Sequence, residues 1–256
     1  MTDAPLQRMR ITIEYDGSGL VGWQRQDNGP SVQQYLEEAA LRLTGRATLV
    51  QGSGRTDAGV HATGQVAHLD VPAHLDSKAV MMGLNSWLET PAISVCHAAP
   101  VAADFHARFD AIERHYLYRI YCHPARPALD RGRVWHIRKP LDVKAMREAA
   151  NYLVGRHDFT SFRATACQAE SPVRTLDRLD VISENGEIHI RAVARSFLHH
   201  QIRNITGSLA EVGLGKQKPR WMKTVLEARD RTKAGQTAPA SGLYLSDIFY
   251  PGDARD

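Results

Sequence analysis

The chain has 256 residues, of which 43% are hydrophobic and 23% charged, and its formal net charge is +4. This composition fits one large globular domain or two small ones and excludes wholesale disorder. No run approaches the ~18 apolar residues of a membrane span, and residues 1–10 lack the apolar segment of a signal peptide. Cys96, Cys122 and Cys167 form no C-x-x-C pair, so neither a disulfide framework nor a zinc site is indicated, and a cytoplasmic protein is expected.

The first half of the chain predicts the order strand, helix, strand, strand, helix, strand. Apolar residues alternate over 10–15, and Ser31 is placed to cap a helix that Gly45 ends. The remaining predicted elements are strands at 47–51 and 65–70, a helix from about 76 to 88 and a strand at 93–97. This is the split βαβ order of ferredoxin-like domains.

The second half repeats that order less clearly. We expect strands at 115–122, 176–182, 187–194 and 243–250, helices from Asp142 to Gly155 and over 198–213, a further helix after Pro219, and a surface connection over 124–140. Asn185-Gly186 predicts a tight hairpin. We therefore predict an α+β fold of two tandem ferredoxin-like halves, 1–109 and 110–256, sharing a central, mostly antiparallel sheet with helices on one side and a cleft on the other.

A glycine-rich loop, Gly54–Ala62, places Arg55 and Asp57 between two predicted strands. Such segments are commonly plain turns, because Asp bonds its own backbone and Gly accepts positive φ. Loops held by two strands also commonly carry catalytic groups. The catalytic hypothesis is that Asp57 is a nucleophile.

Other chemistries lack their sequence signals. There is no G-x-S-x-G or P-loop motif, and Gly17-Ser18-Gly19 is interpreted as a turn. His199 and His200 are adjacent, and in a helix they would point roughly 100° apart, so they cannot form the i, i+4 pair of an H-E-x-x-H site. We expect neither a metal nor a cofactor.

Three further residues allow two interpretations each. Arg203 lies off the apolar stripe of its helix and suits either a cleft or solvent. Tyr116 and Tyr118 share a strand face with Ile120, which suits core packing or the stacking of RNA bases.

Several segments, taken in order, resemble the tRNA pseudouridine synthase A family over nearly the whole chain. The matching segments are Gly54-Arg55-Thr56-Asp57-Ala58-Gly59-Val60-His61, Ile13-Glu14-Tyr15-Asp16-Gly17, Gly22-Trp23-Gln24-Arg25-Gln26, Ser31-Val32-Gln33, Asp104–Phe109, Asp158–Arg163, Phe197–Asn204 and Gly242–Leu245. The resemblance implies an isomerase that converts uridine to pseudouridine at positions 38, 39 and 40 of the tRNA anticodon stem and loop. It also implies a homodimer that uses no cofactor or metal.

The resemblance also implies residue roles. Asp57 matches the catalytic aspartate, Arg203 the residue that pairs with it, and Tyr116 the aromatic that packs on the target base and can relay a proton. Leu245 matches an apolar pocket residue, and Arg55 a residue that fills the space of the flipped nucleotide; Tyr118 is a second candidate for base contact. Two alternatives stay open: a non-catalytic RNA-binding module, and a synthase acting on another RNA or tRNA position.

Overall fold

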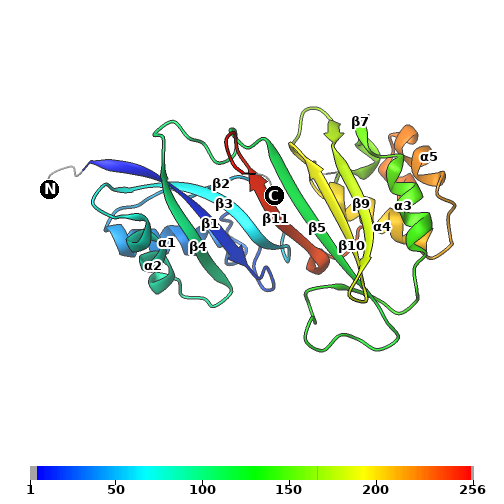
Figure 1. The fold of residues 1–256 in the computed structure, drawn as a ribbon, viewed down its shortest axis with the longest axis horizontal. Coiled ribbons are helices and arrows are strands. Elements are labelled where there is room, and N and C mark those ends of the chain that lie inside the picture. The colour runs from blue at the N-terminus through cyan, green and yellow to red at the C-terminus, as the bar shows by residue number, and fades with distance from the viewer. Residues whose placement is uncertain (1–4, 166, 255–256) are drawn as a thin grey trace. The chain divides into compact units, whose positions relative to one another are not determined.

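The computed structural model describes residues 5–165 and 167–254, which divide into two compact units (Figure 1). Within that range, unit 1 comprises residues 5–112 and 245–254, and unit 2 comprises residues 113–244. The fold is mixed α/β with mostly antiparallel strands, and the described residues form five α-helices. The predicted ranges 1–109 and 110–256 differ from these units mainly in the last segment, which packs in unit 1.

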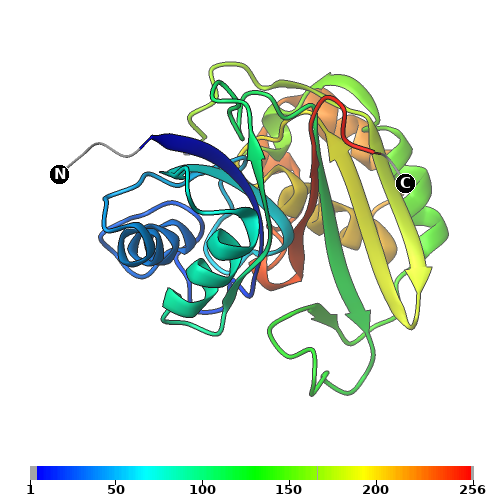
Figure 2. The same ribbon diagram turned by 60° about the vertical axis from the view of Figure 1, so that its left-hand side comes forward.

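Unit 1 has a sheet in the order β4-β1-β3-β11, and the short β2 pairs with β3. Its elements are β1 (Leu6–Tyr15), α1 (Val32–Thr44), β2 (Gln51–Gly52), β3 (His61–Pro72), α2 (Ser77–Trp87), β4 (Ile93–Val101) and the residues of β11 (Leu243–Phe249) from Leu245 onward. Strand β1 runs antiparallel to both β3 and β4. Figure 2 shows α1 and α2 together against one face of this sheet.

The local signals in unit 1 explain most of these elements. Ile11, Ile13 and Tyr15 are buried on one face of β1, as the alternation predicts. Ser31 caps α1 by accepting from the Gln34 N–H, and Gly45 ends the helix in the left-handed region. The strand predicted over residues 47–51 is wrong, because only Gln51–Gly52 pairs with β3.

Unit 2 has a sheet in the order β5-β10-β9, and β6 runs parallel to β5. Its elements are β5 (Glu113–Cys122), β6 (Trp135–Ile137), α3 (Val143–Asn151), β7 (Gly155–Asp158), β8 (Val173–Leu176), β9 (Arg178–Glu184), β10 (Glu187–Ala194), α4 (Gln201–Gly213) and α5 (Trp221–Ala228). Helices α3, α4 and α5 lie on one face of the strands (Figure 2). The hairpin predicted at Asn185-Gly186 is confirmed, since both residues have positive φ between β9 and β10.

Several boundaries predicted in unit 2 are wrong. The strand predicted over 176–182 is broken at Asp177, because β8 pairs with β7 while β9 pairs with β10. Helix α3 ends at Asn151 instead of Gly155, since the N–H groups of Tyr152 and Leu153 form tighter i to i−3 bonds. The connection over 124–140 contains β6, which the sequence prediction leaves out.

No helix within the described range is both long and apolar enough to cross a membrane.

Candidate active-site elements

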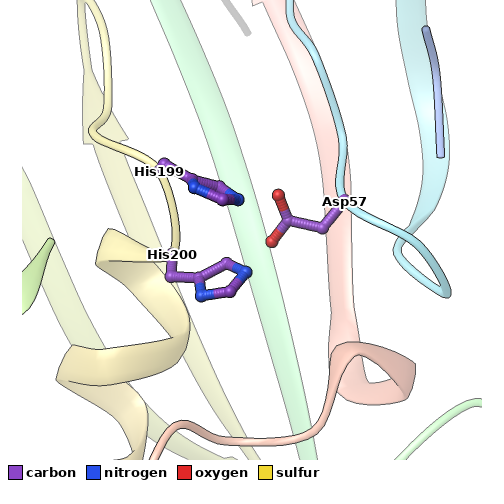
Figure 3. A group of neighbouring side chains, drawn as sticks. All are labelled: Asp57, His199 and His200. Carbon is purple, nitrogen blue, oxygen red and sulfur yellow. The ribbon is translucent and has the colours of Figure 1, made fainter. Parts of the chain in front are cut away.

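The loop that carries Asp57 is held by hydrogen bonds on both sides of that residue. The Thr56 carbonyl accepts from the Trp23 N–H at 3.1 Å, and the Gly59 N–H donates to the Leu20 carbonyl at 3.3 Å. The Val60 N–H donates to the carbonyl of Asp57 itself at 3.1 Å. The half-buried Asp57 side chain therefore projects from a loop whose main chain is fixed on each flank (Figure 3).

Glycines in the segment after β1 allow the two main chains to approach this closely. A Cβ on Gly22 would lie 2.4 Å from the Thr56 carbonyl oxygen, and one on Gly17 would lie 2.1 Å from that of Val60. Gly22 also has a φ of +105°, a conformation that glycine adopts without steric cost. Gly17 and Gly22 are therefore positioning residues for the Asp57 loop.

Side chains of β1 and β3 hold the same loop through two further polar contacts. The Tyr15 hydroxyl lies 2.8 Å from the Thr56 Oγ1, and the Gln65 side-chain amide donates to the Gly54 carbonyl at 2.8 Å. Burial raises the pKa of Tyr15 to about 12, so its hydroxyl stays neutral as a hydrogen-bonding group at ordinary pH. The loop around Asp57 is thus pre-organised within unit 1.

Arg203 lies in the first turn of α4 in unit 2 and is tied to the segment before β11. Its Nε donates to the Ala238 carbonyl at 2.9 Å, and the Ala238 N–H donates back to the Arg203 carbonyl at 3.1 Å. This pairing uses one guanidinium N–H and holds the side chain beside residues 238 and 239. Arg203 is therefore a partly buried, oriented arginine rather than a freely solvated one.

The two tyrosines of β5 have different surroundings. Tyr116 is half-buried, and its ring meets that of Phe197 edge to face at a centroid distance of 5.0 Å. Tyr118 is fully buried, and its hydroxyl donates to the Pro239 carbonyl at 2.7 Å. Burial raises the pKa of Tyr118 above its ordinary value, with nearby Arg203 opposing the shift. Tyr116 alone of the pair presents ring surface to solvent.

The two adjacent histidines do not lie in a helix, which corrects the prediction that they point about 100° apart. Helix α4 begins at Gln201, and His200 precedes it with a φ of +61°. Their ring centroids are 4.1 Å apart, and both rings project from the turn before α4 (Figure 3). No third His, Cys, Asp or Glu among the described residues of unit 2 joins them to form a metal-binding group.

The remaining candidate residues differ in exposure. Arg55 is exposed in the same loop as Asp57, whereas Leu245, at the point where β11 enters unit 1, is fully buried. The sequence alone did not identify Tyr15, Gly17 and Gly22 as supports of the Asp57 loop. The short contacts of both glycines and the positive φ of Gly22 follow from the fold, and their sequence signal is limited to the matching segments 13–17 and 22–26.

A profile of the family described as tRNA pseudouridine synthase matches residues 11–110 and 149–251. The relative from Rhodospirillum rubrum, named tRNA pseudouridine synthase A, is 57% identical over 96% of this chain and 88% of its own length. The relatives of the same name from Maricaulis maris and Sinorhizobium fredii are 52% and 53% identical over 97% and 96% of this chain and the full length of each relative. This chain belongs to the tRNA pseudouridine synthase A family.

The family assignment covers the candidate residues unequally. Asp57, Arg203 and Leu245 lie inside the matched segments, whereas Tyr116 and Tyr118 lie in the interval between them. Members of this family are isomerases that form pseudouridine in tRNA. The family therefore supplies the reaction class, and the described geometry supplies the candidates that carry it.

Proposed function

We propose that this chain isomerises uridine to pseudouridine at positions 38, 39 and 40 in the anticodon stem and loop of tRNA. The observation that carries the proposal is the Asp57 loop: a single carboxylate on a pre-organised loop, within the segment that matches the family. Asp57 is the sole carboxylate between Gly54 and Ala62.

The reaction requires the bond between the ribose C1′ and the uracil N1 to break and a bond from C1′ to C5 to form. An ionised Asp57 can attack C1′ as N1 leaves, as the nucleophile of a retaining glycosidase does, and is released when C5 attacks C1′ in turn. C5 then loses its proton and N1 gains one. Alternatively, Asp57 can remove a sugar proton and return it later. Both routes need an ionised carboxylate whose position is fixed before the substrate binds.

Three residues of unit 2 complete the proposed site. Arg203 pairs with Asp57 and keeps it ionised, a role that suits a guanidinium already oriented by the Ala238 carbonyl. Tyr116 stacks on the target base, which its half-exposed ring beside Phe197 favours. Tyr118 is a weaker candidate for base contact, because its ring is buried and its hydroxyl already donates to Pro239.

Two further residues have proposed substrate roles. Leu245 forms part of the apolar wall of the uracil pocket, and Arg55 fills the space that the flipped nucleotide leaves in its stack. The exposure of the Arg55 side chain supports a role that requires contact with RNA.

The proposed architecture is two ferredoxin-like halves that share one central sheet, acting as a cytoplasmic homodimer. The order of β4, β1, β3 and β2 in unit 1 supports the first half, because it is the order that a βαββαβ chain gives when β1 pairs with both neighbours. In unit 2 the order β5, β10, β9 supports the first three strands of the second half.

The test is a pseudouridine map of unmodified tRNA after incubation with the protein, read by carbodiimide modification and primer extension. We expect new stops at positions 38, 39 and 40 with the wild type and none with Asp57→Asn, although Asp57→Asn still binds tRNA. Stops at other positions would favour a synthase with a different target, and tRNA binding without any stop would favour a non-catalytic RNA-binding module. Turnover by Asp57→Asn at the wild-type rate would exclude the proposed role of Asp57.

A further inference from the structure

A cavity of about 290 Å³ in unit 2 is lined by three arginines. The lining residues are Arg156, Ser171, Val173, Arg174, Thr175, Arg195 and Ser196. They come from β7, from β8 with the residues just before it, and from the two residues directly after β10. No carboxylate of the described chain lines this cavity, so its formal charge is +3.

Arg174 is the part-buried member of the set, and its partners are all neutral. Its Nη1 donates to the carbonyls of Ser171 and Val173 at 2.9 and 2.7 Å. Its Nε is buried and has no hydrogen-bond partner within the described chain. Burial lowers the pKa of Arg174, as expected for a cation that is removed from water without a carboxylate. A buried cation of this kind is stabilised when an anion joins it.

Arg156 and Arg195 surround this donor with uncompensated charge. Both side chains are exposed, and neither makes an ion pair with a described carboxylate. The cavity in unit 1 differs in this respect: it contains Arg8, but Asp70 accepts two hydrogen bonds from that guanidinium at 2.8 and 3.0 Å. In the unit 2 cavity, unlike Arg8, none of the three arginines pairs with a carboxylate of the described residues.

The position of the cavity links it to the proposed base-stacking residue. Ser196 lines the cavity, and the next residue, Phe197, meets the ring of Tyr116. The Arg195 carbonyl also accepts a hydrogen bond from the Arg114 guanidinium, two residues before Tyr116. An anion held here would therefore lie on the same part of unit 2 as the stacking ring.

We propose that Arg156, Arg174 and Arg195 bind a phosphodiester group of the RNA strand that carries the target uridine. The proposal rests on the proposed function, because it assigns part of the RNA backbone to a place beside Tyr116. Guanidinium groups match the oxygens of a phosphate, and the Ser and Thr hydroxyls of the cavity can donate to the same oxygens. Such a contact positions the strand and carries no sequence information.

The primary experiment measures tRNA binding by Arg156→Gln, Arg195→Gln and the double variant over a series of KCl concentrations. These side chains are exposed, so their loss should not prevent folding. Loss of one phosphate contact should raise the Kd about tenfold and lower the slope of log Kd against log[KCl] by roughly 0.7 to 0.9. In the pseudouridine assay the KM should rise to a similar extent while kcat stays close to the wild-type value.

Arg178→Gln is the matched control, because Arg178 is an exposed arginine of the same unit whose Nε pairs with Asp180 at 3.0 Å. It should keep the wild-type Kd and salt dependence. Arg174→Lys keeps the charge of the buried member but removes its forked donors, and it should weaken tRNA binding without changing the slope. If the double variant binds tRNA with the Kd and slope of the wild type, the proposal is wrong.

Inorganic phosphate, added at constant ionic strength, distinguishes a site for the RNA backbone from a site for free phosphate. Competition with tRNA by phosphate, lost in the double variant, would support the RNA proposal; phosphate binding that leaves tRNA affinity unchanged would overturn it. Failure of the proposed function has a different result: the wild type would form no pseudouridine, whereas the dependence of RNA binding on Arg156 and Arg195 would remain measurable.

Discussion

The Asp57 loop in unit 1 and the start of α4 in unit 2 both have close main-chain contacts, and the α4 region adds a network of buried side chains. On the two flanks of Asp57 main chain meets main chain, as between Trp23 and Thr56, and glycine is needed where the chains meet. Near Arg203 main chains also meet at a glycine, since a Cβ on Gly207 would lie 1.7 Å from the Gln236 carbonyl oxygen, but buried side chains join the two segments as well. Asn204 is fully buried, and its Oδ1 accepts from the Arg231 guanidinium at 3.0 Å and from the Thr237 hydroxyl at 2.7 Å.

The difference indicates which mutations each region tolerates. Where two main chains are in van der Waals contact at a glycine, there is no room for an added methyl group. Replacing that glycine by alanine therefore moves the whole loop. A side-chain network responds instead to the loss of a donor or acceptor, because a buried partner is left without a hydrogen bond. Added volume should therefore disrupt the Asp57 loop, whereas the α4 region should respond to deleted polar atoms as well as to added volume.

The largest effect is expected for Gly22→Ala. The new Cβ would lie 2.4 Å from the Thr56 carbonyl oxygen, and the φ of +105° is unfavourable for alanine. We expect a loss of roughly 3 kcal/mol in the free energy of unfolding and a fall in kcat of about 100-fold, since displacement of the loop displaces Asp57. Urea unfolding and the pseudouridine assay measure the two effects.

Gly19→Ala is the matched control in the same segment. Gly19 also has a positive φ, +80°, but a Cβ there would meet nothing within 4 Å. Only the conformational cost of about 1 kcal/mol should remain, with little change in kcat. If both variants lose activity equally, the close approach of Gly22 to Thr56 is not what positions Asp57.

The second prediction concerns the buried network beside α4. Asn204→Ala removes the acceptor of Arg231 and Thr237 and the donor to the Phe162 carbonyl, a bond of 2.9 Å. We expect the free energy of unfolding to fall by about 2 to 3 kcal/mol, which the urea midpoint reports. Asn204→Asp keeps an oxygen that can accept from Arg231 and Thr237 and should lose less; a greater loss would show that the donated bond to Phe162 dominates.

The third prediction is a pH dependence located in unit 1. Burial lowers the pKa of His68 to about 4, and Arg8 and His106 add to the shift. The neutral ring accepts from the Ala107 N–H at 3.1 Å, a bond that a protonated Nδ1 cannot accept. Between pH 6.5 and 4 the unfolded chain therefore binds more protons at this site than the folded chain does.

Stability from His68 is thus fully present above about pH 6.5 and is lost as the pH falls toward 4. We expect this residue to lower the free energy of unfolding by on the order of 1 to 2 kcal/mol over this pH range. Urea unfolding of His68→Asn, which keeps an acceptor for Ala107, should show a flatter pH profile. The exposed His74→Asn should keep the wild-type profile; equal profiles for wild type and His68→Asn would contradict the assignment.

The local sequence signals predicted what depends on neighbouring residues alone. Ser31 and Gly45 bound α1, and Asn185-Gly186 forms its hairpin, because caps and tight turns are set within a few residues. The sequence predicts that α4 begins at residue 198, but it begins at Gln201. Leu198 is buried like the helix residues, and the left-handed His200 breaks the helix without a glycine. The role of Gly22 was missed because its contact, Thr56, lies on another loop.

The smallest expected effect comes from removing the hydroxyl groups of the two tyrosines of β5, which distinguishes their roles. Tyr118→Phe removes the 2.7 Å bond to the Pro239 carbonyl, and we expect about 1 kcal/mol less stability in urea with little change in kcat. Tyr116→Phe keeps the ring against Phe197, so it should preserve stability. If Tyr116 acts by stacking alone, kcat also stays near the wild-type value; if its hydroxyl relays a proton, kcat falls while tRNA affinity is retained. A larger loss of activity in Tyr118→Phe than in Tyr116→Phe would reverse the proposed assignment, because the hydroxyl of the buried ring would then matter more to the reaction.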